Sequence, residues 1–121
     1  MAILEVKNLT KLYKNGRGVK DVSFEVEQGD IVGLLGPNGS GKTTIMKVIM
    51  GLIHANSGST LIFGEDIEKD VEKALKDVGG LIERPALFEF LTARENLEMA
   101  ARLYGGAVTT ERIDRVLDIV R

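Results

Sequence analysis

The chain has 121 residues, of which 44% are hydrophobic and 28% are charged, and its formal net charge is −2. This length accommodates one domain at most and the hydrophobic content argues against disorder, so we expect a soluble globular domain. The small net charge gives no sign of a polybasic surface for nucleic acid, and the absence of cysteine is compatible with a reducing compartment. No apolar run reaches the roughly 18 residues of a membrane-spanning helix.

The first third of the chain has the pattern of short strands joined by turns. Apolar residues within positions 3–6 indicate a first strand, and alternating apolar and polar residues over 22–26 indicate a half-buried second strand. The glycine-containing segment 15–18 predicts a turn between them, and 28–30 predicts another. Residues 31–35 are nearly all apolar, which is typical of a central strand covered on both faces.

A glycine-rich segment follows this apolar run and carries the strongest chemical signal in the chain. It has the spacing G-x-x-x-x-G-K-[ST] of a phosphate-binding loop, between a predicted strand and a predicted helix. Its glycines can adopt positive φ values, which turn successive backbone N–H groups inward as an anion-binding nest. The residues of this predicted site are Gly36, Pro37, Asn38, Gly39, Ser40, Gly41, Lys42, Thr43 and Thr44.

Two side chains at the end of the loop complete the chemistry of the predicted site. Lys42 is suited to reach the β- and γ-phosphates as a cation, and Thr43 offers a hard hydroxyl oxygen to Mg²⁺. The unpaired amides at the start of the following helix add to the attraction for negative charge. The alternative is an ordinary glycine-rich turn between a strand and a helix, which does not require a Lys-Thr pair after its last glycine. We therefore interpret the segment as a nucleotide-binding site.

The middle of the chain continues the alternation of helices and strands. The hydrophobic pattern predicts a helix over residues 44–52, a strand over 60–63, a helix over 67–77 and a strand over 79–82. A loop over 83–90 follows the last of these strands. This alternation is typical of an α/β fold.

The last third of the chain predicts two helices. Thr92 and Glu95 have the spacing of a capping box, and the helix that they open ends at the glycine pair 105–106. Either Thr109 or Thr110 caps a second helix, whose apolar stripe runs to the last residue. Because the sequence stops inside a helix whose stripe has no partner, we expect the chain to be truncated.

Five segments together resemble the amino-terminal half of an ABC transporter ATP-binding subunit. They read LEVKNL at 4–9, Y at 13, VSF at 22–24, GDIVGLLGPNGSGKTT at 29–44 and LTARENL at 91–97. The resemblance covers essentially the whole chain and implies an incomplete α/β fold, a P-loop NTPase of the ABC ATPase type. Its implied parts are an antiparallel β subdomain, the phosphate loop and the start of a helical subdomain. The implied boundaries are about 1–90 for the nucleotide-binding core and about 91–121 for the start of the helical subdomain.

The resemblance also implies a role for Tyr13, which stands where this family has an aromatic ring that stacks on adenine. Such stacking contributes about 1–3 kcal/mol in other nucleotide-binding systems. The alternative is a strand-edge aromatic that packs on the sheet. We favour stacking because the neighbouring Lys11 and Lys14 indicate a polar loop. ATP is then the nucleotide that Lys42 and Thr43 bind together with Mg²⁺.

Glu83 departs from the family pattern, which has glutamine at this place. The glutamine meets Mg²⁺ and the attacking water and senses the membrane partner. A carboxylate keeps the metal-facing oxygen but adds negative charge near the γ-phosphate. The resemblance therefore implies Lys42 and Glu83 as catalytic residues and Thr43 and Glu83 as metal ligands. The alternative is a solvated loop carboxylate beside Arg84.

The function implied by the resemblance is that of an ATP-hydrolysing subunit which energises a membrane exporter. Glutamate at position 83 resembles the exporters that confer resistance to lantibiotics and bacitracin-like peptides, so antimicrobial peptides are the implied substrate class. The implied partners are an integral membrane permease and a second ATP-binding subunit, with no nucleic acid. The implied location is cytoplasmic, on the inner face of the cell membrane.

Two other classes of function remain open from the sequence. One is a soluble ABC-type ATPase that acts on ribosomes or DNA, and the other is a nucleotide-binding fragment without hydrolysis. The family's signature, Walker B and switch-histidine motifs are not found among these 121 residues. Because phosphoryl transfer depends on groups around the whole γ-phosphate, we expect weak MgATP binding and negligible turnover from this chain alone.

Overall fold

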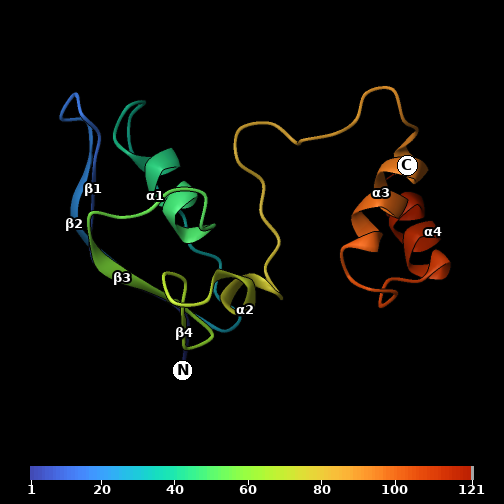
Figure 1. Ribbon diagram of the computed structural model, residues 1–121, viewed down its shortest axis with the longest axis horizontal. Coiled ribbons are helices and arrows are strands. Elements are labelled where there is room, and N and C mark those ends of the chain that lie inside the picture. Colours follow the sequence, from blue (N-terminus) through green and yellow to red (C-terminus); the bar gives the residue numbers. More distant parts are fainter. Residues whose placement is uncertain (121) are drawn as a thin grey trace. The chain divides into compact units, whose positions relative to one another are not determined.

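The computed structural model describes residues 1–120 and divides the chain into two compact units, the first of which ends at Arg84 (Figure 1). The first unit contains β1 (Ala2–Leu12), β2 (Gly18–Glu27), α1 (Lys42–Ile49), β3 (Ser57–Ile62), β4 (Glu65–Asp66) and α2 (Val71–Leu75). The second unit contains α3 (Ala93–Arg102) and α4 (Thr110–Ile119).

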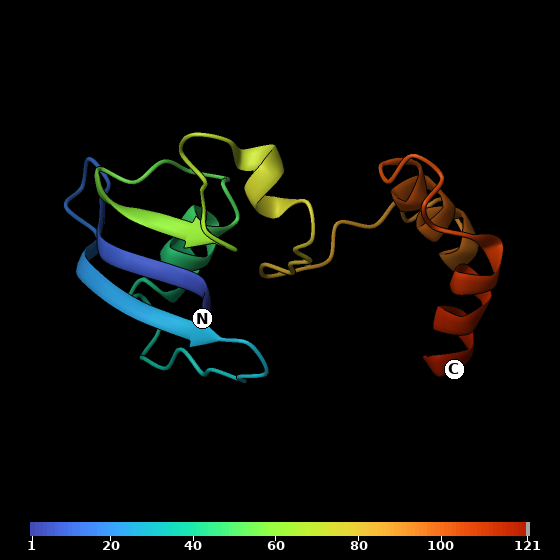
Figure 2. The ribbon, with the colours of Figure 1, turned by 90° about the horizontal axis from the view of Figure 1, so that it is seen from below.

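The strands form one antiparallel sheet in the order β2-β1-β3-β4. Val6 of β1 lies opposite Phe24 of β2 and Thr60 of β3, so β1 is paired along both of its edges. Backbone pairing on both sides stabilises β1, which extends over eleven residues, well beyond the predicted segment 3–6. Figure 2 shows β2, β1 and β3 side by side. The predicted strands at 3–6 and 22–26 are confirmed.

The core of the first unit lies between the sheet and α1, which covers one face of it (Figure 2). Ile45, Val48 and Ile49 of α1 are buried, because their spacing places them on one side of the helix. They pack in one cluster with residues of the sheet and of the segment that follows it, namely Val6, Leu9, Val19, Ile62, Ile67 and Ala74. This packing fixes the position of α1, and with it the end of the loop that precedes the helix.

Two predicted strands are absent from the structure. Residues 31–35 and 79–82 have no regular secondary structure, and Ile31 and Leu35 are more than nine-tenths exposed. A strand that is buried on both faces forms only where neighbouring strands satisfy its backbone N–H and C=O groups. Within residues 1–120 neither segment pairs with a strand, so the prediction of a central strand before the phosphate loop is wrong for this structure.

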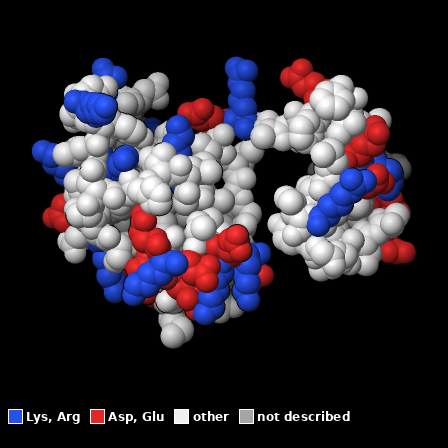
Figure 3. Space-filling view, viewed as in Figure 1, with Lys and Arg blue, Asp and Glu red and all other residues white. Residues whose placement is uncertain are grey.

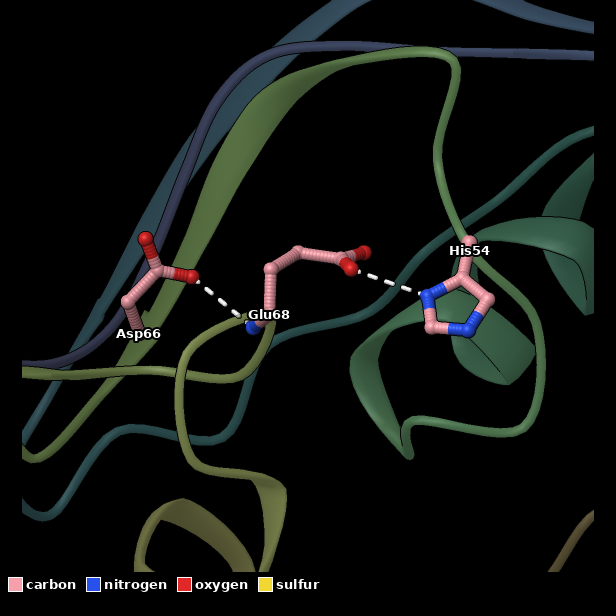
Figure 4. A network of polar contacts seen from close by, with 3 residues as sticks. All are labelled: His54, Asp66 and Glu68. Carbon is pink, nitrogen blue, oxygen red and sulfur yellow. Dashed lines mark hydrogen bonds and ion pairs between the residues drawn. The ribbon is translucent and has the colours of Figure 1, made fainter.

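Charged side chains gather on the surface over β4 and α2 (Figure 3). Lys73 Nζ lies 2.9 Å from Glu65 Oε1, and the hydrogen bond to this carboxylate raises the pKa of Lys73. His54 Nδ1 lies 2.8 Å from Glu68 Oε2, and the backbone N–H of Glu68 donates to the carboxylate of Asp66 (Figure 4). Exposed contacts of this kind contribute little to stability.

The second unit is a pair of capped helices. The predicted capping box is confirmed: Thr92 Oγ1 accepts from the Glu95 backbone N–H at 3.1 Å, and the Thr92 N–H donates to Glu95 Oε1 at 2.9 Å. Thr109, one of the two predicted candidates, caps α4. Arg94 of α3 and Asp114 of α4 form an ion pair at 2.5 Å. Among residues 1–120, no helix has the length and apolar character needed to cross a membrane.

Candidate functional site: the phosphate loop and its cavity

The phosphate loop runs directly into the amino terminus of α1. Gly41 occupies the N-cap position with a φ of 101°, and the helix has no side-chain cap there. The first backbone N–H groups of α1 are therefore free to face an anion, and the positive end of the helix dipole lies at the same place. Gly39 also has a positive φ, of 84°. Two of the three loop glycines, Gly39 and Gly41, thus have the positive φ that was expected for a phosphate nest, and Gly36 does not.

Gly41 also lies against the sheet, which explains why glycine is required there. A Cβ atom added at Gly41 would lie 2.1 Å from Cγ1 of Val19, a buried residue of β2. Together with the positive φ, this close approach excludes every other residue type without a shift of the backbone. The contact fixes the end of the loop against the start of β2.

The side chains at the start of α1 face the loop and the solvent. Lys42 is half-buried, and its Nζ donates a hydrogen bond to the backbone carbonyl oxygen of Gly36, so that the ammonium group lies over the loop. Thr43 is exposed and Thr44 is half-buried. Within the loop, the Ser40 N–H donates to the carbonyl oxygen of Pro37 at 3.1 Å and closes a turn.

A cavity of about 290 Å³ opens in front of the loop. Its lining comes from two segments, the turn between β1 and β2 and the phosphate loop with the first turn of α1. The lining residues are Tyr13, Asn15, Arg17, Gly18, Asn38, Gly39, Gly41, Lys42, Thr43 and Thr44. Two of them are cations and none is a carboxylate, so the cavity is suited to a negatively charged ligand. Gly36, Pro37 and Ser40 belong to the loop but do not line the cavity.

Tyr13 lies at the edge of this cavity, immediately after the end of β1. Its hydroxyl is 3.5 Å from Oγ1 of Thr44, and the residue as a whole is 40% exposed. Lys11 Nζ lies 5.6 Å from the centre of the ring, within the range of a cation–π contact. The ring therefore lies beside the phosphate loop, where a base attached to bound phosphates could reach it.

Glu83 is the one predicted site residue outside Tyr13 and the phosphate loop, and the structure does not bring it to the cavity. It belongs to the same unit as the loop, is exposed, and is not among the lining residues. Within residues 1–120 it makes no ion pair with the neighbouring Arg84. Its φ is 62°, which is uncommon for glutamate. Its role in metal binding and catalysis therefore remains a hypothesis based on the resemblance.

The cavity fits the phosphates of a nucleotide with Mg²⁺. Magnesium is usually held by one or two protein oxygens together with phosphate oxygens and water, and the hydroxyl of Thr43 can supply one of these ligands. Among the described residues there is no group of three or more histidine, cysteine or acidic side chains that could hold a metal by itself. A Mg²⁺ ion at this cavity would need phosphate oxygens and water beside the hydroxyl of Thr43.

Three lining residues were missed in the sequence analysis, namely Asn15, Arg17 and Gly18. The segment 15–18 was predicted only as a turn. The signal that could have identified it is its place directly after Tyr13, since a ligand that contacts Tyr13 also comes close to the turn that follows it.

The family model, the similar curated proteins and the similar solved structures all point to ABC transporter proteins. Residues 19–121 match the family described as ABC transporter. An uncharacterized ABC transporter ATP-binding protein, YhcH of Bacillus subtilis, is 42% identical over 118 residues, which are 98% of this chain and 38% of that protein. The bacitracin transport ATP-binding protein BcrA of Bacillus licheniformis has the same identity and the same coverage.

Solved structures agree in fold. An ATP-binding subunit of an ABC transporter matches with a TM-score of 0.77 at 37% identity, over 87% of this chain and 44% of that one. A dimeric bacterial ABC transporter cassette matches with a TM-score of 0.78 at 31% identity, over 95% of this chain and 54% of that one.

The fold and the phosphate loop define a P-loop NTPase fold of the ABC ATPase type, as predicted. The chain belongs to the ABC transporter family and corresponds to the amino-terminal part of its ATP-binding cassette. It spans 38% of the length of the two Bacillus relatives.

Proposed function

We propose that this chain binds MgATP in the cavity between the β1–β2 turn and the phosphate loop. The single observation that carries the proposal is the convergence of the uncapped amino terminus of α1, Lys42 and Tyr13 on one cavity without carboxylates. In this proposal the amides of the loop and Lys42 bind the β- and γ-phosphates, Thr43 binds Mg²⁺, and Tyr13 stacks on adenine. The family assignment supports ATP as the nucleotide.

Hydrolysis is proposed for the complete cassette and not for this chain alone. The residues that line the cavity can bind and orient a triphosphate, but none of them is a carboxylate that could position an attacking water. In the complete protein we assign Lys42 to charge stabilisation at the γ-phosphate and Glu83 to the metal and the water. We propose domain boundaries near residues 90 and 91, close to the change of compact unit after Arg84.

The complete protein is proposed to energise a membrane exporter. The names of the relatives support transport, and the relative named for bacitracin transport supports antimicrobial peptides as the substrate class. The partners would be an integral membrane permease and a second ATP-binding subunit, and the dimeric cassette among the similar structures supports the latter. The proposed location is the cytoplasm, at the inner face of the cell membrane.

An affinity purification of the complete protein from its own cells tests this proposal against the two alternatives. Co-purification with an integral membrane protein, together with ATP hydrolysis that this partner stimulates, is the expected result. Co-purification with ribosomes or DNA instead would favour the soluble ABC-type ATPase. Nucleotide binding without turnover in the complete protein would favour the non-hydrolysing alternative.

A further inference from the structure

The turn between β1 and β2 is a closed structure that holds Arg17 beside Tyr13. The Tyr13 N–H donates to the Arg17 carbonyl oxygen at 2.7 Å, and the Gly16 N–H donates to the Tyr13 carbonyl oxygen at 2.8 Å. In addition, Asn15 Oδ1 accepts from the Arg17 N–H at 3.0 Å. Three hydrogen bonds therefore fix the backbone from which the Arg17 side chain extends.

This turn is also held against the phosphate loop. Gly41, at the end of the loop, lies so close to Val19 that a Cβ atom would overlap its side chain. Val19 is buried and is separated from Arg17 by one residue. The two walls of the cavity are therefore fixed relative to one another within the first unit, at the end where the β1–β2 turn and the loop before α1 lie (Figure 1).

Arg17 is one of two cations in the cavity lining, and Lys42 is the other. Arg17 comes from the β1–β2 turn and Lys42 from the start of α1, and no lining residue is acidic. Within residues 1–120 Arg17 forms no ion pair with a carboxylate. Its guanidinium group is therefore available for an anionic ligand, and its planar set of donors suits the oxygens of a phosphate group.

We propose that Arg17 is a nucleotide-binding residue that contacts the α- and β-phosphates. The proposal rests on the proposed binding of MgATP, since it extends the same site. Tyr13 defines the base end of the bound nucleotide, and Gly39 to Thr43 define the end that holds the terminal phosphate. Arg17 extends from the base end, so its long side chain reaches the phosphates nearest the ribose. ATP and ADP share these phosphates, and Arg17 therefore strengthens the binding of both.

The test compares variants that remove the positive charge of the side chain with a variant that keeps it. Arg17→Gln removes the charge, Arg17→Lys keeps it, and Lys14→Gln makes the same change of charge on the same turn at a residue outside the cavity lining. Dissociation constants for MgATP and MgADP are measured by calorimetry on the full chain at low and high salt. Circular dichroism spectra establish that each variant is folded.

We expect Arg17→Gln to raise the dissociation constants for MgATP and MgADP by about three- to tenfold at low salt and by less at high salt. The reason is that the contact is charge-assisted and partly exposed. Arg17→Lys should recover part of this lost affinity, and the affinities of Lys14→Gln should remain within about twofold of those of the unchanged protein.

Equal affinities for Arg17→Gln and Lys14→Gln would overturn the role of Arg17 and leave the proposed function intact. If Arg17→Gln lost affinity for MgATP and not for MgADP, the proposed contact with the α- and β-phosphates, which both nucleotides share, would be overturned. Failure of the unchanged protein to bind MgATP would overturn both proposals.

Discussion

Gly41 is the residue on which the geometry of the phosphate loop depends most directly. Gly41→Ala places a side chain at a φ of 101° and 2.1 Å from Val19 Cγ1. We expect it to destabilise the protein by about 1–3 kcal/mol and to abolish detectable MgATP binding, because the loop must move away from β2. Urea unfolding and calorimetric titration measure the two effects. Gly33→Ala is the control, since its φ is not positive and its Cβ would meet open space; an equal effect of both variants would contradict this explanation.

Tyr13 tests the base end of the cavity. Tyr13→Ala removes the ring and should weaken MgATP binding by about 1–3 kcal/mol, the contribution of one stacked base. Tyr13→Phe keeps the ring and loses only the hydroxyl, which lies at the long distance of 3.5 Å from Thr44 Oγ1. We therefore expect Tyr13→Phe to bind nearly as well as the unchanged protein. A loss of the same size in both variants would show that the hydroxyl, and not the ring, supports binding.

At the scale of the element, α3 provides a prediction about pH. The backbone hydrogen bond from Thr92, followed by the side-chain hydrogen bond, lowers the pKa of Glu95 below its ordinary value of 4.5. Because the folded pKa is the lower one, this stabilisation is present above pH 4.5 and is lost as the pH falls through the folded pKa. Helix content measured by circular dichroism should therefore fall in acid. Glu95→Gln keeps a capping side chain without the titrating carboxylate and should reduce this pH dependence; an unchanged profile would contradict the assignment.

The side chain of Thr92, which caps the amino terminus of α3, allows a separate prediction about stability. Thr92→Ala removes the oxygen that accepts from the Glu95 N–H, and we expect it to destabilise α3 by about 1 kcal/mol. Chemical unfolding followed by circular dichroism measures this loss. Thr92→Ser keeps the capping oxygen and serves as the matched control. If both variants unfold at the same denaturant concentration, the cap does not contribute to the stability of the helix.

The elements that could be predicted from the sequence are those whose signals are local. The capping box of α3, the cap of α4 and the alternation in β2 each depend on residues within a few positions of one another. Residues 31–35 and 79–82 were predicted as strands from apolar character alone, and a buried strand requires partners that apolar character does not supply. Within the described residues no such partner is present, so these predictions failed for a tertiary reason.

The difference between local sequence signals and tertiary contacts also applies to the candidate nucleotide site. The phosphate loop was predicted because its spacing is local, and Tyr13 was predicted through a family resemblance. Arg17 was not predicted, because its place in the cavity depends on the close approach of Gly41 to Val19, two residues separated by a long stretch of chain. The roles of all these residues in nucleotide binding remain predictions until binding is measured.

At the scale of the whole molecule, Glu83 is the residue whose role requires the complete protein. Its assigned contacts are with the metal, the attacking water and the membrane partner, and it lies outside the cavity lining. In the complete protein we expect Glu83→Gln to keep ATP hydrolysis, because the amide retains an oxygen that can face the metal. Glu83→Ala should abolish hydrolysis or uncouple it from transport. Unchanged transport by the alanine variant would show that Glu83 does not connect the two activities.

The most direct measurement is a calorimetric titration of the folded protein with MgATP, beside the Lys42→Ala variant. We predict saturable binding by the unchanged protein and an affinity at least about tenfold lower in the variant, because a charge-assisted contact with phosphate is lost. Lys42 takes part in no packing within the core cluster, so the variant should remain folded. No binding by the folded, unchanged protein, or equal binding by Lys42→Ala, would contradict the assignment of this loop as the phosphate-binding site.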